Sequence, residues 1–194
     1  HRKTGERLLD YVEVERCGEW ERPARLAPVG LRVFRRSSRE SLFGRAHEPL
    51  AELLHARPGW RSDRSARLLN WRFAGRPGVP YEVVQLLDLR GRSRGYAVLR
   101  KHGTVARIVD LQVRNEEGAD LPELLREVSD AGGAETLRIR APRRGLLAAR
   151  LADELGFSPA ETDCSFTVRR LREGFDVAEA ARSFDYRFAD HDIF

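Results

Sequence analysis

The stretch that most constrains the fold runs from Thr104 to Leu125, TVARIVDLQVRNEEGADLPELL. Its first half is a β-branched, apolar run of strand length: Ile108, Val109, Leu111 and Val113. Its second half has apolar residues at i, i+3, i+4 and i+7, the spacing of one buried helix face: Leu121, Leu124, Leu125 and Val128. We expect Asp120 to cap this helix and Gly132–Gly133 to end it. A strand that leads into a helix N-terminus can bind an anion, because free N–H groups point outward there.

The remaining pattern predicts an α/β chain with further strands and helices on both sides of this stretch. Further strands are expected at Leu8–Val14, Leu31–Arg35, from Val79, at Gly95–Lys101, Thr136–Ile139 and Ser165–Arg169. Helices are expected at Ser41–His55, from Asp63 or Ser65 to Phe73, and at Arg143–Leu155. Short turns that contain Gly91 and Gly103 predict an antiparallel meander from Val79 to Val113 at the sheet centre. Residues 18–30, GEWERPARLAPVG, are interpreted as a connector, and Trp71 is expected to be buried.

The charge of the chain is high but evenly spread. The net charge is +5, and only two of the 35 basic residues are lysines, Lys3 and Lys101. A basic nucleic-acid-binding module is therefore conceivable. The arginines are interleaved with 30 acidic residues, and we find no recognition helix or aromatic-basic platform, so this hypothesis is the weakest. The arginines can still favour anionic ligands.

The N-terminus and the cysteines indicate what kind of protein the chain comes from. It contains no Met and opens on His1, which leads us to expect a piece of a longer protein. Cys17 and Cys164 lack the spacing of a metal or redox site. With no secretory signal and no apolar run of membrane-span length, we expect a cytoplasmic protein with reduced thiols.

The predicted order of elements over residues 31–170 resembles the GNAT (GCN5-related) N-acetyltransferase fold, an α/β (α+β) fold with a mixed, mostly antiparallel sheet flanked by helices. RIVDLQV is similar to the family's fourth strand, whose splayed end receives the pantetheine amides of CoA. LADELGF is similar to the end of its last core helix. DRSARLLNWRF, the Pro80–Tyr81 pair and RGYAVLRK resemble GNAT proteins associated with bacterial polysaccharide biosynthesis.

Some of those proteins carry two GNAT halves, and FDYRFADHDIF resembles their C-terminal ending. The resemblance implies an N-terminal arm or connector (1–30), a GNAT-like domain (31–170) and a C-terminal tail on the domain (171–194). It also implies an N-terminal GNAT half or a homodimer partner, and a small-molecule amine or sugar-amine acceptor, with no membrane partner. Acetyl-CoA or another acyl-CoA is the implied cosubstrate, or none if the half is inactive.

The loop after the fourth strand departs from the family pattern. The family has (Arg/Gln)-x-x-Gly-x-(Gly/Ala), whose backbone cradles the CoA phosphates. Here Arg114–Asp120 is RNEEGAD, shorter by about two residues, with one glycine and with three carboxylates where the phosphates would lie. Ala152 stands where the family often has a general-acid Tyr, and Gly145 where an Asn is common. These departures favour a catalytically degenerate half.

If the site is intact, the resemblance places CoA along one set of residues: Leu111, Val113, Arg114, Gly118, Ala119, Arg143 and Arg144. Asp110 is the candidate general base and Glu82 the second candidate. The alternative for Asp110 is an ion pair with an arginine of a neighbouring strand. For Arg143–Arg144 it is a solvated basic pair. We expect no metal site, because Asp190–Asp192 are three adjacent residues that cannot all face one ion on regular structure.

Two further side-chain types have weaker claims to a role. Tyr81 and Tyr96 can supply a phenol to an acceptor groove, although half-buried strand tyrosines are common. His102 lies in a turn, where a solvated histidine is the simpler interpretation.

Two hypotheses follow from these patterns. In the first, the chain transfers an acyl group directly from CoA to a primary amine. In the second, it is a non-catalytic GNAT-like domain that shapes the acceptor site of an active half. The degenerate loop favours the second, and we expect weak or absent acetyl-CoA binding.

Overall fold

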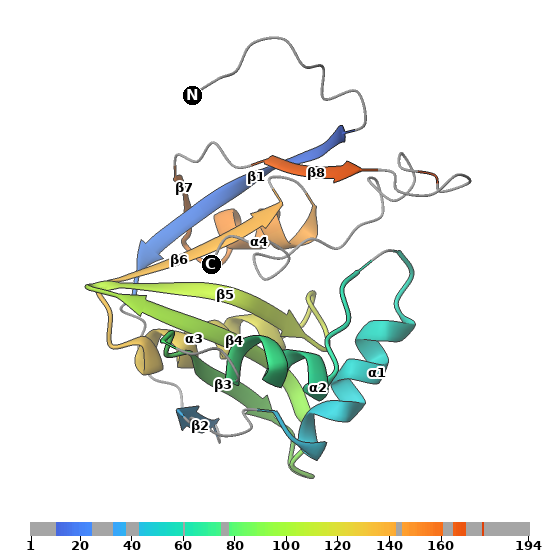
Figure 1. The fold of residues 1–194 in the computed structure, drawn as a ribbon. Helices are drawn as coiled ribbons and strands as arrows, with labels where there is room; N and C mark the ends of the chain where they lie inside the picture. The colour runs from blue at the N-terminus through green and yellow to red at the C-terminus, as the bar shows by residue number, and fades with distance from the viewer. Residues whose placement is uncertain are drawn as a thin grey trace.

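A computed structural model describes residues 11–24, 33–37, 43–59, 61–74, 78–142, 145–160, 165–169 and residue 176 of the 194-residue chain (Figure 1). Its centre is one mixed sheet with the strand order β2-β3-β4-β5-β6-β1-β7, and β8 pairs with the other half of β1. The strands are β1 (Tyr11–Pro23), β2 (Val33–Ser37), β3 (Glu82–Leu87), β4 (Ser93–His102), β5 (Val105–Val113), β6 (Thr136–Pro142), β7 (Ser158–Ala160) and β8 (Ser165–Arg169).

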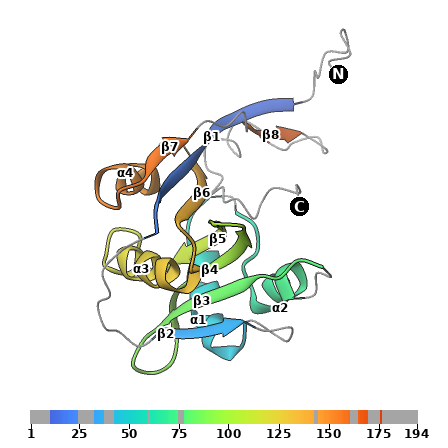
Figure 2. The same ribbon diagram turned by 90° about the vertical axis from the view of Figure 1, so that its left-hand side faces the viewer.

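The helices are short except for α3. They are the 3-10 turn η1 (Arg45–His47), α1 (Glu48–Ala56), α2 (Ala66–Leu69), the π-helical turn η2 (Asn70–Ala74), α3 (Asp120–Gly132) and α4 (Leu146–Asp153). In Figure 2, α3 and α4 lie on one side of the sheet and α1 and α2 on the other. No helix in the described part of the chain is long and apolar enough to cross a membrane.

The predicted central meander is confirmed. Strands β3, β4 and β5 are consecutive and antiparallel, with Val83 opposite Val98 and Ala97 opposite Leu111. Gly91 and Gly103, in the two connecting turns, have φ values of 74° and 58°. These left-handed conformations are the reason that glycine is needed in both turns.

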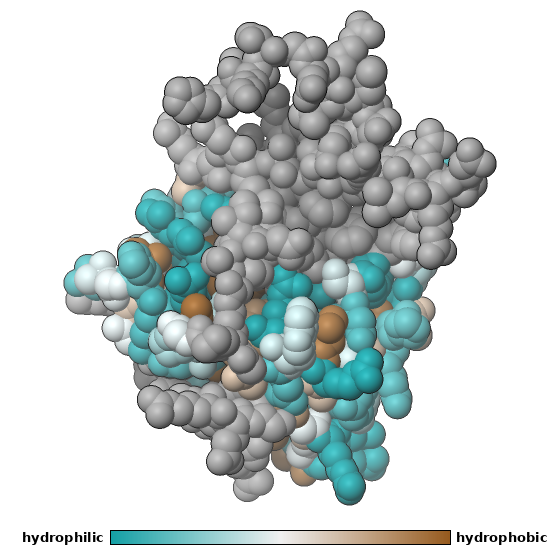
Figure 3. Space-filling view, in the orientation of Figure 1, coloured by the Kyte–Doolittle hydropathy of each residue, from teal (hydrophilic) through white to brown (hydrophobic). Residues whose placement is uncertain are grey.

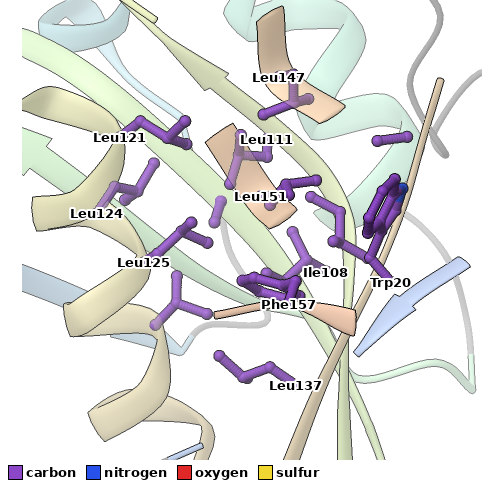
Figure 4. Close-up of a cluster of buried hydrophobic side chains, with 14 of the residues drawn as sticks. Trp20, Ile108, Leu111, Leu121, Leu124, Leu125, Leu137, Leu147, Leu151 and Phe157 are labelled. Carbon is purple, nitrogen blue, oxygen red and sulfur yellow. The ribbon is translucent and has the colours of Figure 1, made fainter. Parts of the chain in front are cut away.

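Each face of the sheet carries its own apolar core. On one face, α3 and α4 pack their leucines against Ile108, Leu111 and Leu137 (Figure 4). On the other, α1, α2 and η2 cover Val83, Tyr96 and Val98. Residues of β3, β4 and β5 contribute to both cores, because alternate side chains of a strand point to opposite faces.

A β-bulge in β5 decides which residues enter which core. Val98 is opposite Asp110 whereas the next residue, Leu99, is opposite Ile108, so Val109 is the extra residue. Ile108 therefore faces α3, and so does Leu111, three residues later. The bulge keeps Asp110 out of that apolar core and on the α1 face.

The connector expected at the N-terminus is, in its first part, a strand. Gly18–Pro23 belong to β1, which pairs with β6 through Cys17–Pro23 and with β8 through Tyr11–Arg16. Pro23 is the last residue of the strand and Trp20 is buried in the core, so neither breaks the pairing. Strand β7, three residues that pair with β1, was not predicted. The domain boundaries stay a prediction.

Trp71 is the clearest error among the sequence predictions, since 73% of it is exposed. The core side chains of this segment are Leu69 and Phe73, and Trp71, midway between them, points away from the sheet. Asn70, where the π-helical turn begins, bonds the backbone N and O of Phe43 at 2.8 and 2.7 Å through its side chain. This tie holds the inward face of the turn in place.

The helix ends agree in part with expectation. Gly133 has φ 51° and ends α3 in the left-handed conformation, and Gly156 is followed by the buried Phe157. Asp120 does not cap α3: Ala119 is the N-cap, and Asp120 lies in the first turn. Helix α4 begins at Leu146 rather than at Arg143. Arg143 and Arg144 lie outside the described residues.

Candidate functional site

The site suggested by the sequence lies where β5 and β6 separate. Their parallel ladder runs only from Val105–Thr136 to Ile108–Ile139, yet β5 continues to Val113 and β6 to Pro142. The two strands visibly diverge after this point (Figure 1). Beyond Ile108 and Ile139, the facing backbone groups do not bond each other in this ladder. A ligand with amide groups could pair with the facing edge of β5 there.

The carbonyls at the end of β5 already have a partner. Arg57, just after α1, donates from Nη2 to the carbonyl oxygens of Val113 and Arg114, at 2.9 and 2.7 Å. The guanidinium thus fastens the end of β5 to α1. Sequence reasoning missed Arg57, because it is one arginine among many and nothing in its neighbourhood marks it.

The N-terminus of α3 is neutralised by carboxylates of its own first turn. Arg94 pairs with Asp120 Oδ1, and its Nη1 lies 3.1 Å from Glu123 Oε2. The Nε of Arg114 is 3.4 Å from Asp120 Oδ2. Partial burial alone would lower the pKa of Arg94, but Asp120 and Glu123 raise it. The positive end of the helix dipole thus already faces negative charge.

The loop between β5 and α3 turns carbonyls, not amides, toward α4. Arg150 of α4 donates from Nη1 to the carbonyl oxygens of Glu116 and Gly118, and its Nε bonds Glu154 at 2.8 Å. Gly118 has no positive φ, which a glycine in a backbone N–H nest commonly adopts. Inside the loop, the amide of Glu117 bonds the side chain of Asn115.

These contacts do not fit the diphosphate of CoA. A phosphate cradle needs converging N–H groups, and here a guanidinium and two carboxylates occupy the loop and the helix start. Of the residues that resemblance assigned to CoA, Leu111 and Val113 lie buried in the α3-side core. Arg114 and Ala119 are exposed, and Gly118 is half-buried.

The candidate base Asp110 lies at the centre of a buried polar cluster on the α1 face. Its Oδ2 accepts a hydrogen bond from the Tyr96 hydroxyl at 2.8 Å and lies 3.1 Å from Nε of Arg64. Its Oδ1 accepts from the amide of Leu111. Asp110 and its partners Tyr96 and Arg64 are all buried. Asp110 therefore forms an ion pair with an arginine, as the alternative interpretation expected. The partner, Arg64, comes from the segment before α2 and not from a neighbouring strand. Its role as a base stays a prediction.

His47 completes this cluster and was missed in the sequence. It is fully buried, its Nε2 lies 2.7 Å from the carbonyl of Arg64, and its ring meets those of Phe43 and Tyr96 edge to face at 5.0 and 5.1 Å. Burial lowers the pKa of His47, against smaller opposing effects of the Arg64 carbonyl, Glu48 and Asp110. The lowered pKa favours the neutral form of His47 in the folded protein.

The other candidates are not brought to this cluster. Glu82 begins β3, half-buried, with Lys101 Nζ at 3.4 Å. Tyr81 is buried, and its hydroxyl has no hydrogen-bond partner within the described residues. His102 is exposed at the end of β4, and Asp190–Asp192 lie outside the described residues. Among the residues that the structure describes, no group of three or more His, Cys, Asp or Glu side chains could hold a metal.

Comparison with known proteins identifies the fold. A probable N-acyltransferase from Enterococcus faecalis, a conserved protein of unknown function, is similar with a TM-score of 0.57 at 13% identity, over 82% of this chain and 40% of its own. A GCN5-related N-acetyltransferase from Anabaena variabilis is similar with a TM-score of 0.54 at 12% identity, over 82% of this chain and 40% of its own. The chain has a GNAT-like fold. This confirms the fold expected from the resemblance, and the link to polysaccharide biosynthesis stays a prediction.

A third structure with this fold is a functionally unknown conserved protein from Staphylococcus epidermidis, with a TM-score of 0.51 at 12% identity over 78% of this chain and 58% of that one. No family model and no curated protein matches the sequence. The chain spans less than half the length of the first two structures. Identities this low establish the GNAT-like fold alone.

Proposed function

We propose that this chain is a degenerate half of a longer GNAT-type N-acyltransferase. In this proposal it supports a catalytic half, shapes the binding site of an amine acceptor, and does not itself bind acyl-CoA. The observation that carries the proposal is the start of α3, where Asp120 and Glu123 hold Arg94 and where the loop carbonyls face Arg150.

The energetic argument concerns the diphosphate. In this fold, CoA would depend on amide donors around its phosphates. Each charge-assisted hydrogen bond that is missing weakens binding by about 1.5–3 kcal/mol. Two or three missing bonds lower the affinity by roughly a hundredfold to many thousandfold, since about 1.4 kcal/mol is tenfold. Glu116 and Glu117 in the same loop add repulsion.

Calorimetric titration of the chain with acetyl-CoA tests the proposal. We expect no binding in the micromolar range. A low-micromolar dissociation constant that is lost in Arg114→Glu would place CoA at the end of β5 and overturn the proposal. Arg114 is exposed, so this substitution leaves both cores intact. Circular dichroism of each variant shows whether the fold survives.

A loop graft provides the complementary experiment. Replacing Arg114–Asp120 with a full-length Gly-rich loop removes Glu116, Glu117 and Asp120 and adds amide donors. We expect measurable acetyl-CoA binding in this variant, because the ends of β5 and β6 are still apart. The matched control carries a loop of the same length in which the glycines are replaced by Ala. Equal binding by graft and control would show that backbone donors are not what the chain lacks.

Direct acyl transfer is the second candidate function, and one observation favours it: the retained separation of β5 and β6. Asp110 would be its base, although Arg64 and Tyr96 hold that carboxylate. Release of free CoA from acetyl-CoA in the presence of an amine, lost in Asp110→Asn but not in Asp88→Asn, would support this function. Absence of turnover with a panel of amines would leave the supporting role.

A further inference from the structure

A row of arginines crosses three strands in direct register. Arg100 of β4 is opposite Arg107 of β5, and Arg107 is opposite Arg138 of β6. Registered residues on neighbouring strands point to the same face, and neighbouring strands are about 4.7–4.9 Å apart. Three guanidinium groups are therefore brought together by backbone pairing alone.

The row lies on the sheet face opposite α3 and α4. The residues that alternate with it, Ala106, Ile108, Leu137 and Ile139, enter the α3-side core. On the arginine face, the second core ends at Val98 and Val109. The side chains of Arg107 and Arg138 remain 38% and 36% exposed, so a solute can reach them. In the view of Figure 3, most of the described residues that are visible are hydrophilic, with a few hydrophobic side chains between them.

Within the described part of the chain, two carboxylates lie beside the three arginines of the row. Arg138 Nη2 is 2.9 Å from Glu21, and Arg107 Nη2 is 3.4 Å from Glu19. Arg140 stands opposite Glu19 in register. Arg100 forms no ion pair within the described part of the chain.

Two observations indicate that this arrangement is suited to an anion. Like charges directly opposite one another destabilise a sheet, so an array of three carries a cost in the free protein. The Nε atoms of Arg107 and Arg138 are buried and have no hydrogen-bond partner among the described residues. Burial lowers the pKa of Arg107. Glu19 opposes this effect, and Arg140, Arg138 and Arg100 lower the pKa further. A bound anion would offset the repulsion between these guanidinium groups.

We propose that Arg100, Arg107 and Arg138 form a binding site for a small multivalent anion, such as a diphosphate or a polycarboxylate. Guanidinium groups bind phosphate and carboxylate oxygens in pairs, and strand spacing places successive groups where two linked anionic groups can engage both. The site does not depend on the proposed function, since it lies on the opposite face from α3 and its loop.

Calorimetric titration of the full chain at low ionic strength tests the site with three probes: sodium pyrophosphate, citrate and inorganic phosphate. We expect pyrophosphate or citrate to bind at least roughly tenfold more tightly than phosphate, because only they span two guanidinium groups. Pyrophosphate tighter than citrate identifies a phosphate ligand, and the reverse a carboxylate ligand. Equal, weak heats for all three probes would overturn the proposal.

The decisive variant is Arg100→Gln, which breaks no ion pair with a described residue and so is expected to keep the fold. It and Arg100→Gln/Arg138→Gln should lower the affinity for the preferred probe stepwise, by roughly tenfold per arginine. The charge-matched control is Arg90→Gln/Arg126→Gln, with one change in the β3–β4 turn and one on α3. An equal loss in the control would show general electrostatic attraction and refute a site.

Two further arms separate this site from other sources of binding. Acetyl-CoA binding that disappears in Arg100→Gln/Arg138→Gln but survives Arg114→Glu would come from the arginine row. It would support this site and leave the degenerate-half proposal standing. Affinity for single-stranded oligonucleotides that rises with length and exceeds that for pyrophosphate by a hundredfold would overturn a small-anion site in favour of nucleic-acid binding.

Discussion

At the scale of single residues, Trp20 and Trp71 lie in opposite environments. Trp20 is 7% exposed and packs in the α3-side core, whereas Trp71 is 73% exposed on η2. We expect Trp20→Ala to lower the free energy of unfolding by about 3–5 kcal/mol, because it leaves a large cavity. Trp71→Ala should change it by less than about 0.5 kcal/mol. Urea denaturation of both variants measures the difference, and a comparable loss in both would contradict the fold around η2.

The buried histidine predicts a pH dependence at the same scale. Burial lowers the pKa of His47 below its ordinary value of 6.5. The unfolded chain therefore binds a proton more readily, and the contribution of His47 to stability is present above about pH 6.5 and is lost as the pH falls below it. The slope from this residue is at most about 1.4 kcal/mol per pH unit, the limit for one proton.

Urea denaturation between pH 7.5 and pH 5 measures this slope. His47→Gln should flatten it, whereas the exposed His102→Gln should leave it unchanged. A slope that is the same in the two variants would show that other groups cause the acid sensitivity.

At the scale of elements, the contact between β4 and β5 is tight enough to exclude a methyl group. A Cβ added at Gly95 would lie 2.9 Å from Val113 Cγ1 and 3.0 Å from the carbonyl oxygen of Gln112. We expect Gly95→Ala to cost about 1–3 kcal/mol, because the backbone must move. Gly44 is the control: it is extended, and an added Cβ meets nothing within 4 Å. Thermal unfolding compares the stability of the two variants. A Gly95→Ala variant as stable as the unsubstituted protein would show that the end of β5 can move to make room for the methyl group.

At the scale of the whole molecule, β1 holds together strands that lie far apart in the sequence. It pairs with β6, β7 and β8, so residues near 11–23 bind residues near 136–169. Removing residues 1–24 should therefore abolish cooperative unfolding. Strand β6 would lose its partner strand and become an edge strand, and the core would lose Trp20. Adding the 1–24 peptide in trans should restore it. A truncated chain with a sharp transition within about 1 kcal/mol of the full chain would contradict this account.

The sequence by itself determined the local elements, because their information is local. The apolar spacing from Ile108 to Val128 and the glycines in the turns specify a strand, a helix and a meander wherever they occur. It also supplied the basis of the proposed loss of a phosphate site, since the single glycine and the three carboxylates of Arg114–Asp120 are visible without coordinates.

Only the tertiary structure decided which side chains meet. Arg64, His47 and Arg57 lie in unremarkable segments, and folding brings them to Asp110 and to the end of β5. The arginine row likewise depends on register between strands that are distant in the chain. Residue types and periods predict elements, whereas a bulge, a pairing register or a buried partner arises from contacts between elements, which local sequence does not encode.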